Sequence, residues 1–402
     1  MVVEDKDQMT SIERWDVTCA LKEPDRVPNA PLNLYLIPYY SKPRLTTHEF
    51  LLNFPKAFEA MAKIWELTEK PDSFVPPFVS IGHWTLLGPL LGFSRWFADW
   101  NIPNWDFEDP RYNIPNYIEK PLFENYDELM EKGLAPLMFS KGVMNPTTKA
   151  QTVDEILDFN FQKIPQFIQL TQEYVQKYQV PTHVGAASMV PFDQISFIRG
   201  MSGTAIDLYR NPDKIKELSD WFVDYECAIG KQVSSLMNPD KAPGAERIFF
   251  WAGRSSATFL SPEVWDEFVY PYVKKIVDNY VKNGFVAYLH WDGDYTPMLE
   301  KIRELDKGLP KGRIIADFEK TDMKKAKEII GDKISLYGNI PSSLLIHGNP
   351  QQVDEACKKL IEDCMEGGGF ILGTECETPY NAKLENMIAM SRAVKKYGYY
   401  RK

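Results

Sequence analysis

The sequence predicts an α/β fold, namely a (β/α)8 barrel of the TIM type with an elaborated N-terminal region. In the second half of the chain, short runs rich in β-branched and aromatic residues alternate with amphipathic helices, as in parallel sheets joined by crossover helices. No Gly/Ser linker, low-complexity tract or internal repeat divides the 402 residues. We therefore expect a single domain over residues 1–402, in which residues 1–75 form a helical and loop extension.

The expected helices of the second half have clear start and stop signals. Ser261 and Pro262 supply an N-cap and a first-turn proline for a helix that ends at Gly284. Asn349 and Pro350 open a later helix in the same way. Short apolar runs between such helices predict strands. In chain order these are His183–Ser188, Arg247–Ala252, Phe285–His290, Arg313–Asp317, Ile334–Gly338 and Phe370–Gly373.

The first half of the chain is less regular. Proline and aromatic residues are dense between Asn29 and Asn116, which indicates long loops and short helices. Thr152 and Glu155 form a capping-box pattern that predicts the start of a helix.

Charge and cysteine content exclude several classes of function. The chain has 46 basic and 56 acidic residues, so its net charge of −10 disfavours nucleic-acid and membrane partners. No run approaches the ~18 apolar residues of a spanning helix, and the first residues are acidic rather than signal-like. The five cysteines are scattered, which is typical of a reducing compartment. We therefore expect a cytoplasmic protein.

Reactive side chains gather where the expected strands end. The carboxyl ends of barrel strands face the active-site mouth. An extended backbone would turn His290 and Asp292 to the same side. Imidazole, carboxylate and thiolate are all Zn²⁺ ligands, and three protein ligands leave a fourth position open, as in catalytic zinc sites. The residues selected by this argument are His290, Asp292, Asp317, Asn339 and Cys376.

The same residues also have structural explanations. His290 could be a hydrogen-bonded core histidine, Asp292 a turn former, and Cys376 a small buried hydrophobic residue. Cys357 and Cys364 share one helical face and are expected to be structural. Residue chemistry alone does not decide whether the residues at the strand ends bind a metal or stabilise the fold.

Four segments of the second half carry a more specific combined pattern: Leu260–Val277, Leu289–Asp306, Ile334–Glu362 and Gly367–Met390. In order and spacing they resemble the uroporphyrinogen-decarboxylase superfamily, particularly its cobamide-dependent methyltransferase branch, which includes O-demethylase enzymes. Before Val180 the resemblance fades to a PDRVP segment at Pro24–Pro28. The resemblance implies a zinc enzyme that exchanges a methyl group with the cobalt of a corrinoid.

In that branch a His-x-Cys pair and a later Cys hold the zinc, so the resemblance implies His290, Asp292 and Cys376 as ligands. Asp292 departs from the pattern. An oxygen ligand donates less charge than a thiolate and leaves the metal a stronger Lewis acid. Glu375 and Glu377 flank Cys376 and are alternative oxygen ligands.

This departure favours O-demethylation of a methoxylated aromatic onto cobalt(I). No D-x-H-x-x-G corrinoid-binding sequence occurs, so we expect the cobalamin-type corrinoid on a separate partner protein. Three alternatives stay open: a methylcobamide:thiol methyltransferase of the coenzyme M type, a uroporphyrinogen-type decarboxylase, and a non-catalytic corrinoid- or porphyrin-binding paralogue. The decarboxylase is disfavoured because its arginine-rich N-terminal signature is missing. A homodimer is a further expectation.

Aromatic residues near the strand ends are candidates for the wall of a substrate pocket, although such residues often form core instead. Asp317 and Asn339 would orient the substrate, and His83 and His183 are candidate proton donors to the leaving group. The candidate pocket residues are Trp251, Trp291, Tyr295 and Tyr337.

Overall fold

The computed structural model describes residues 6–75, 98–99, 108–111, 116–117, 126–133 and 153–400. His83, a candidate proton donor, lies outside the described residues.

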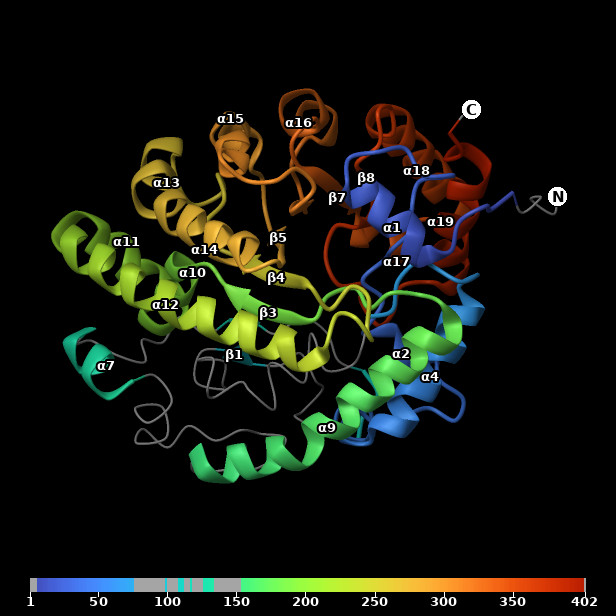
Figure 1. The fold of residues 1–402 in the computed structure, drawn as a ribbon, viewed down its shortest axis with the longest axis horizontal. Coiled ribbons are helices and arrows are strands. Elements are labelled where there is room, and N and C mark those ends of the chain that lie inside the picture. Colours follow the sequence, from blue (N-terminus) through green and yellow to red (C-terminus); the bar gives the residue numbers. More distant parts are fainter. Residues whose placement is uncertain are drawn as a thin grey trace.

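A six-stranded parallel sheet, in the order β3-β4-β5-β6-β7-β8, forms the centre of the molecule (Figure 1). This confirms the expected α/β barrel architecture, and each strand overlaps a run expected from its apolar residues. The strands are β3 (Ala186–Met189), β4 (Arg247–Ala252), β5 (Val286–Trp291), β6 (Ile314–Phe318), β7 (Ser335–Ile340) and β8 (Phe370–Thr374).

Two short N-terminal segments link the open edges of this sheet. Asn29 forms a parallel bridge with Leu372 of β8, and its carbonyl accepts the backbone N–H of Asp72 at 2.6 Å. Phe74 then bridges Thr182, just before β3. The N-terminal region, expected as helices and loops, therefore also supplies a single bridge at each edge of the six-stranded sheet.

Helices flank the sheet (Figure 1). The N-terminal region contains α1 (Ser11–Cys19), α2 (Leu36–Tyr40), α3 (Thr47–Leu52) and α4 (Phe54–Leu67). Next come the antiparallel pair β1 (Ala98–Asp99) and β2 (Asn116–Tyr117), helix α7 (Tyr126–Lys132) and helix α9 (Val153–Tyr178). Between β3 and β4 lie α10 (Pro191–Arg199), α11 (Met201–Arg210) and α12 (Pro212–Met237).

The later crossovers contain α13 (Pro262–Phe268), α14 (Tyr270–Lys282), η3 (Thr296–Met298), α15 (Leu299–Ile302), η4 (Arg303–Asp306), α16 (Met323–Ile330), α17 (Ser342–His347), α18 (Pro350–Cys364) and the final helix α19 (Leu384–Tyr397). The single helix expected from Pro262 to Gly284 is two helices that meet at Val269. Pro271 explains the break, because a proline in the first turn of α14 cannot donate back into α13.

The start signal of α18 works as the sequence indicates. The Asn349 side chain accepts a hydrogen bond from the backbone N–H of Gln352, and the Gln352 side chain accepts one from the backbone N–H of Asn349. Cys357 and Cys364 are fully buried on the inner face of α18, together with Val353. Both thiols therefore pack in the core.

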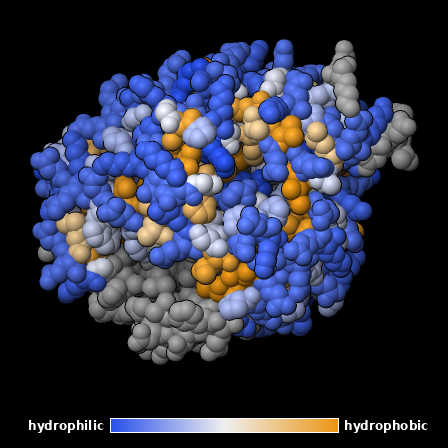
Figure 2. All heavy atoms as spheres, in the orientation of Figure 1, coloured by the Kyte–Doolittle hydropathy of each residue, from blue (hydrophilic) through white to orange (hydrophobic). Residues whose placement is uncertain are grey.

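The surface seen in Figure 2 is mostly hydrophilic, and hydrophobic residues appear on it as separate patches. This fits helices that turn their apolar stripe towards the sheet. Among the described residues, none of the helices combines the length and the apolar character needed to span a membrane.

Candidate metal centre

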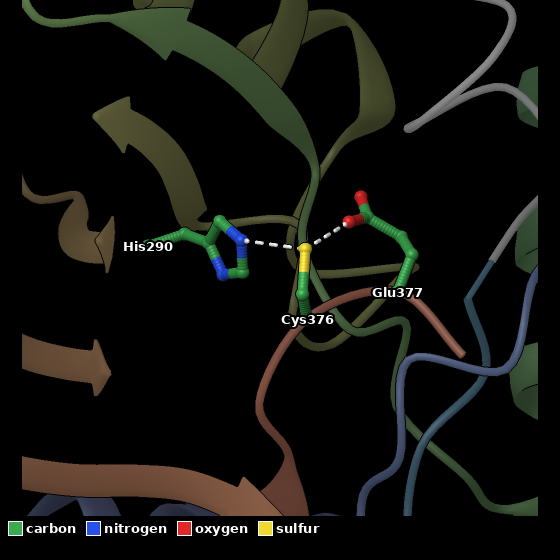
Figure 3. Close-up of side chains that lie close together, drawn as sticks. All are labelled: His290, Cys376 and Glu377. Atoms are coloured by element: carbon green, nitrogen blue, oxygen red, sulfur yellow. Dashed lines mark hydrogen bonds between the residues drawn. The ribbon is translucent and has the colours of Figure 1, made fainter. Parts of the chain in front are cut away.

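His290 and Cys376 meet where β5 and β8 end. His290 is the second-last residue of β5, and Cys376 follows β8 by two residues. The imidazole Nε2 lies 3.6 Å from the Cys376 Sγ, and a Glu377 carboxylate oxygen lies 3.0 Å from the same sulfur. The imidazole and the carboxylate approach the sulfur from opposite sides (Figure 3). One possible ligand atom from each residue lies within 4.8 Å of the other two.

Asp292 borders this cluster. Its Oδ1 lies 3.3 Å from Nε2 of His290, and its Oδ2 accepts the indole N–H of Trp251 at 2.7 Å. Asp292 Oδ1 is buried, and its nearest charged neighbour is the His290 ring. Glu375, the third carboxylate considered, accepts from Lys320 at 2.6 Å and from the N–H of Ser342 at 2.8 Å. Glu377 and Asp292 therefore face the site, whereas Glu375 is engaged elsewhere.

The His290 ring is held on its far side. Its Nδ1 lies 2.5 Å from Oδ2 of Asp317 on β6, and the Phe249 ring stacks on it at a centroid distance of 4.7 Å. Burial alone would lower the pKa of His290, but the carboxylates of Asp317 and Asp292 raise it well above its usual value. Burial raises the pKa of Asp317 to about 6, although His290 opposes this shift.

The charges at the cluster favour a cation. Burial, together with the carboxylates of Glu377 and Asp292, raises the pKa of the Cys376 thiol well above its usual value. A divalent cation would reverse this effect, because it binds the thiolate and the carboxylates in their charged forms. Imidazole nitrogen, thiolate sulfur and carboxylate oxygen form a donor set that fits Zn²⁺. The buried Oδ1 of Asp292 provides a further oxygen beside them.

Two other expected site residues lie at or beside the cluster. Asp317 contacts His290 directly. Trp251, the second-last residue of β4, contacts Asp292 and stacks on Phe197, with ring centroids 5.3 Å apart. Asn339 lies on β7, where its side chain donates to the carbonyls of Glu319 and Thr321 and supports the loop after β6.

The remaining candidates are buried in the packing of the barrel. Trp291 and Tyr295 pack against each other on the outer side of the sheet, where Trp291 also contacts Trp265 of α13. The Tyr337 hydroxyl donates to the carbonyl of Ala30 inside the barrel. Trp291 and Tyr295 therefore lie in the packing outside the sheet, and Tyr337 packs on the rings of His183 and Tyr288 in the barrel interior.

His183 is also buried, and it lies between the hydroxyls of Ser73 and Tyr288 rather than beside Cys376. The sequence reasoning missed Tyr288 and Phe249, whose rings lie next to the site. A signal for Tyr288 was present, because it lies two positions before His290 and shares its face of the strand.

Comparison with known proteins identifies the family of this chain. The sequence matches the family model described as uroporphyrinogen decarboxylase (URO-D) over residues 139–397. The chain belongs to the uroporphyrinogen decarboxylase family. The matched residues include β3 to β8 and hence His290, Cys376 and their carboxylate neighbours.

Curated relatives within this family differ in activity. The chain is 25% identical over 234 residues to a methylated-thiol–coenzyme M methyltransferase of Methanosarcina mazei, covering 58% of each protein. It is 24% identical over 225 residues to a methylcobamide:CoM methyltransferase of the same organism, covering 56% of this chain and 61% of that protein. It is also 26% identical over 163 residues to a uroporphyrinogen decarboxylase of Pseudoalteromonas translucida, covering 39% of this chain and 40% of that one. The match thus spans about six tenths of the length of the methyltransferases.

A solved structure supports the fold over almost the whole chain. A methyltransferase from Methanosarcina mazei superimposes with a TM-score of 0.63 at 16% sequence identity, covering 97% of this chain and 99% of that one. At this identity the likeness concerns the fold alone.

Proposed function

We propose that this protein is a zinc-dependent methyltransferase that moves a methyl group from a small donor to the cobalt(I) of a corrinoid. The corrinoid would be carried by a partner protein, and the donor would be a methoxylated aromatic. The observation that carries the proposal is the donor set at the ends of β5 and β8: one imidazole, one thiol and two carboxylates. Two relatives with methyltransferase names support the reaction class.

His290, Cys376 and Glu377 would hold the metal, and Asp292 is the nearest further oxygen. A bound Zn²⁺ would supply Lewis acidity towards the leaving oxygen of the donor. The Asp317 carboxylate accepts a hydrogen bond from Nδ1 of His290 and so directs Nε2 of the ring towards Cys376. Trp251 holds Asp292 beside the cluster, and its indole would pack on the aryl ring of a bound methyl ether.

The chemistry of the ligands favours a demethylase. A site with one sulfur and carboxylate oxygens leaves the metal more electron-poor than a site with two thiolates. Such a metal stabilises a departing phenolate better than it presents an electron-rich thiolate. The second candidate is a methylcobamide:thiol methyltransferase, and the names of both Methanosarcina relatives favour it.

Metal content and donor chemistry test the proposal together. We expect about one zinc per purified chain, and we expect a panel of methoxylated benzoates to yield the corresponding phenols when cobalt(I) corrinoid is present. Product analysis by NMR detects the lost methyl group. A chain that purifies without zinc and converts no donor in either direction would instead be the non-catalytic paralogue.

A further inference from the structure

A buried chain of hydrogen bonds runs from the His290 imidazole into the barrel interior. The Nδ1 of His290 lies 2.5 Å from Asp317 Oδ2, and the Tyr288 hydroxyl donates to the same oxygen at 3.1 Å. The Nε2 of His183 lies 2.8 Å from the Tyr288 hydroxyl. The Oγ of Ser73 lies 3.1 Å from Nδ1 of His183. Each of these five side chains is at most 3% exposed.

The donors and acceptors along this chain allow one arrangement. The Tyr288 hydroxyl has a single proton and gives it to Asp317, so it can only accept from His183. Nε2 of His183 must therefore carry a proton, and its Nδ1 accepts from Ser73. Burial lowers the pKa of His183 well below its usual value, which agrees with a neutral ring.

This arrangement determines the state of His290. Asp317 Oδ2 accepts from both Tyr288 and His290, so it acts as a carboxylate acceptor with a proton on Nδ1 of the imidazole. The opposite nitrogen, Nε2, is the one that faces Cys376 Sγ at 3.6 Å. A cation can bind only to an unprotonated ring nitrogen, so the network keeps the proton on Nδ1 and leaves Nε2 as the nitrogen that a cation at the cluster would bind.

We propose that Tyr288 and His183 are positioning residues that act through Asp317 to fix the orientation and tautomer of His290 at the metal centre. This inference rests on the metal site of the proposed function. The hydroxyl of Tyr288 bonds to Asp317 and His183, and the His183 ring bonds to Tyr288 and Ser73, so both residues reach the cluster through Asp317. Their effect would be carried by hydrogen bonds alone, as for carboxylates behind metal-bound histidines.

The test compares two tyrosine-to-phenylalanine changes in the intact, zinc-loaded chain. Tyr288→Phe removes the hydroxyl between His183 and Asp317 but keeps the ring. Tyr280→Phe is the matched control, because Tyr280 is equally buried and its hydroxyl lies instead between Ser188 Oγ at 2.8 Å and the backbone carbonyl of Glu226 at 2.9 Å. Zinc affinity is measured by competition with a chromophoric chelator, and ligand geometry by the visible spectrum of the Co²⁺-substituted protein.

We expect Tyr288→Phe to weaken zinc binding about 10- to 100-fold and to change the Co²⁺ spectrum. Tyr280→Phe should lower only the melting temperature. His183→Phe should behave like Tyr288→Phe, whereas His183→Gln, which keeps an N–H donor, should recover part of the affinity. These two variants also serve if Tyr288→Phe folds poorly.

The outcomes separate this inference from the proposed function. Wild-type affinity and spectrum in Tyr288→Phe and His183→Phe would overturn the positioning role and leave the metal site intact. A wild-type chain that binds zinc but transfers no methyl group would contradict the proposed reaction alone. A wild-type chain that binds no zinc would overturn both.

Discussion

Trp251 donates its indole N–H to the Asp292 carboxylate across 2.7 Å and so connects the end of β4 to the residue that follows β5. The bond engages Oδ2 of Asp292 and leaves Oδ1 at 3.3 Å from Nε2 of His290. The indole therefore selects which carboxylate oxygen faces the metal position.

Trp251→Phe should lower the rate of methyl transfer about tenfold while leaving about one zinc per chain. Phenylalanine can still pack on Phe197, but it cannot hold Asp292 in place. Steady-state rates and metal analysis on the same preparation check this. Trp221→Phe, a change on α12 where the indole stacks on Tyr225, is the control. Unchanged activity in Trp251→Phe would mean that Asp292 needs no support from the indole.

Glu377→Gln should weaken zinc binding more than Asp292→Asn, by at least about tenfold in affinity. Both changes remove a charge and keep the shape, but only Glu377 places an oxygen within 4.8 Å of both the His290 and the Cys376 ligand atoms. Chelator competition gives the two affinities. Glu375→Gln breaks the pair with Lys320 and should retain zinc. The opposite order of affinities would make Asp292 the third ligand.

Cys376→Ala should reduce zinc to well below one per chain, because it removes the sulfur from the cluster. The double variant Cys357→Ala/Cys364→Ala should keep its zinc and lose roughly 1 kcal/mol or more of stability per site, since both thiols pack in the core. Metal analysis and denaturant unfolding distinguish the two effects. Full zinc content in Cys376→Ala would exclude the proposed site.

Between acidic and alkaline pH, the Glu226→Gln variant should lose less stability than the wild type. Burial raises the pKa of Glu226 to about 8, against an ordinary 4.5, so the folded state keeps a proton that the unfolded chain releases. The resulting stability is fully present below about pH 4.5 and is lost as pH rises to about 8. Glutamine cannot ionise, so the variant avoids this loss of stability, which is on the order of a few kcal/mol.

Unfolding free energies at pH 6 and pH 8.5 measure the difference between Glu226→Gln and wild type. The exposed Glu217→Gln on the same helix is the control, and it should follow the wild-type pH dependence. If Glu226→Gln and wild type lost stability in parallel between the two pH values, Glu226 would not hold the extra proton.

The strands of the second half could be predicted because each is an apolar run between a glycine and a helix cap. The run Arg247–Ala252 coincides with β4. The two N-terminal bridges could not be predicted in this way. Around Asn29 and Phe74 the pairing consists of single bridges, and nearby prolines hide any alternation of apolar and polar residues.

At the candidate site, strand-end position predicted the meeting of His290 and Cys376. It could not rank the carboxylates, because the direction of Glu375 depends on Lys320 and that of Asp292 on Trp251, and both partners are distant in sequence. Strand-end position also selected Tyr337, whose ring is buried in the barrel interior. An added Cβ at Gly373 would lie 2.0 Å from that ring, so the missing side chain at this position leaves the space that the Tyr337 ring occupies.

The absorption spectrum of a corrinoid tests the central claim most directly, because cobalt(I), cobalt(II) and methyl-cobalt(III) absorb differently and the reaction can be started from either side. With zinc-loaded protein, cobalt(I) corrinoid and a methoxylated aromatic, we expect methyl-cobalt(III) to form, and Cys376→Ala to abolish its formation. Rapid thiol-dependent loss of methyl-cobalt(III), with no methylation of cobalt(I) by any methoxylated aromatic, would contradict the account and identify a thiol methyltransferase.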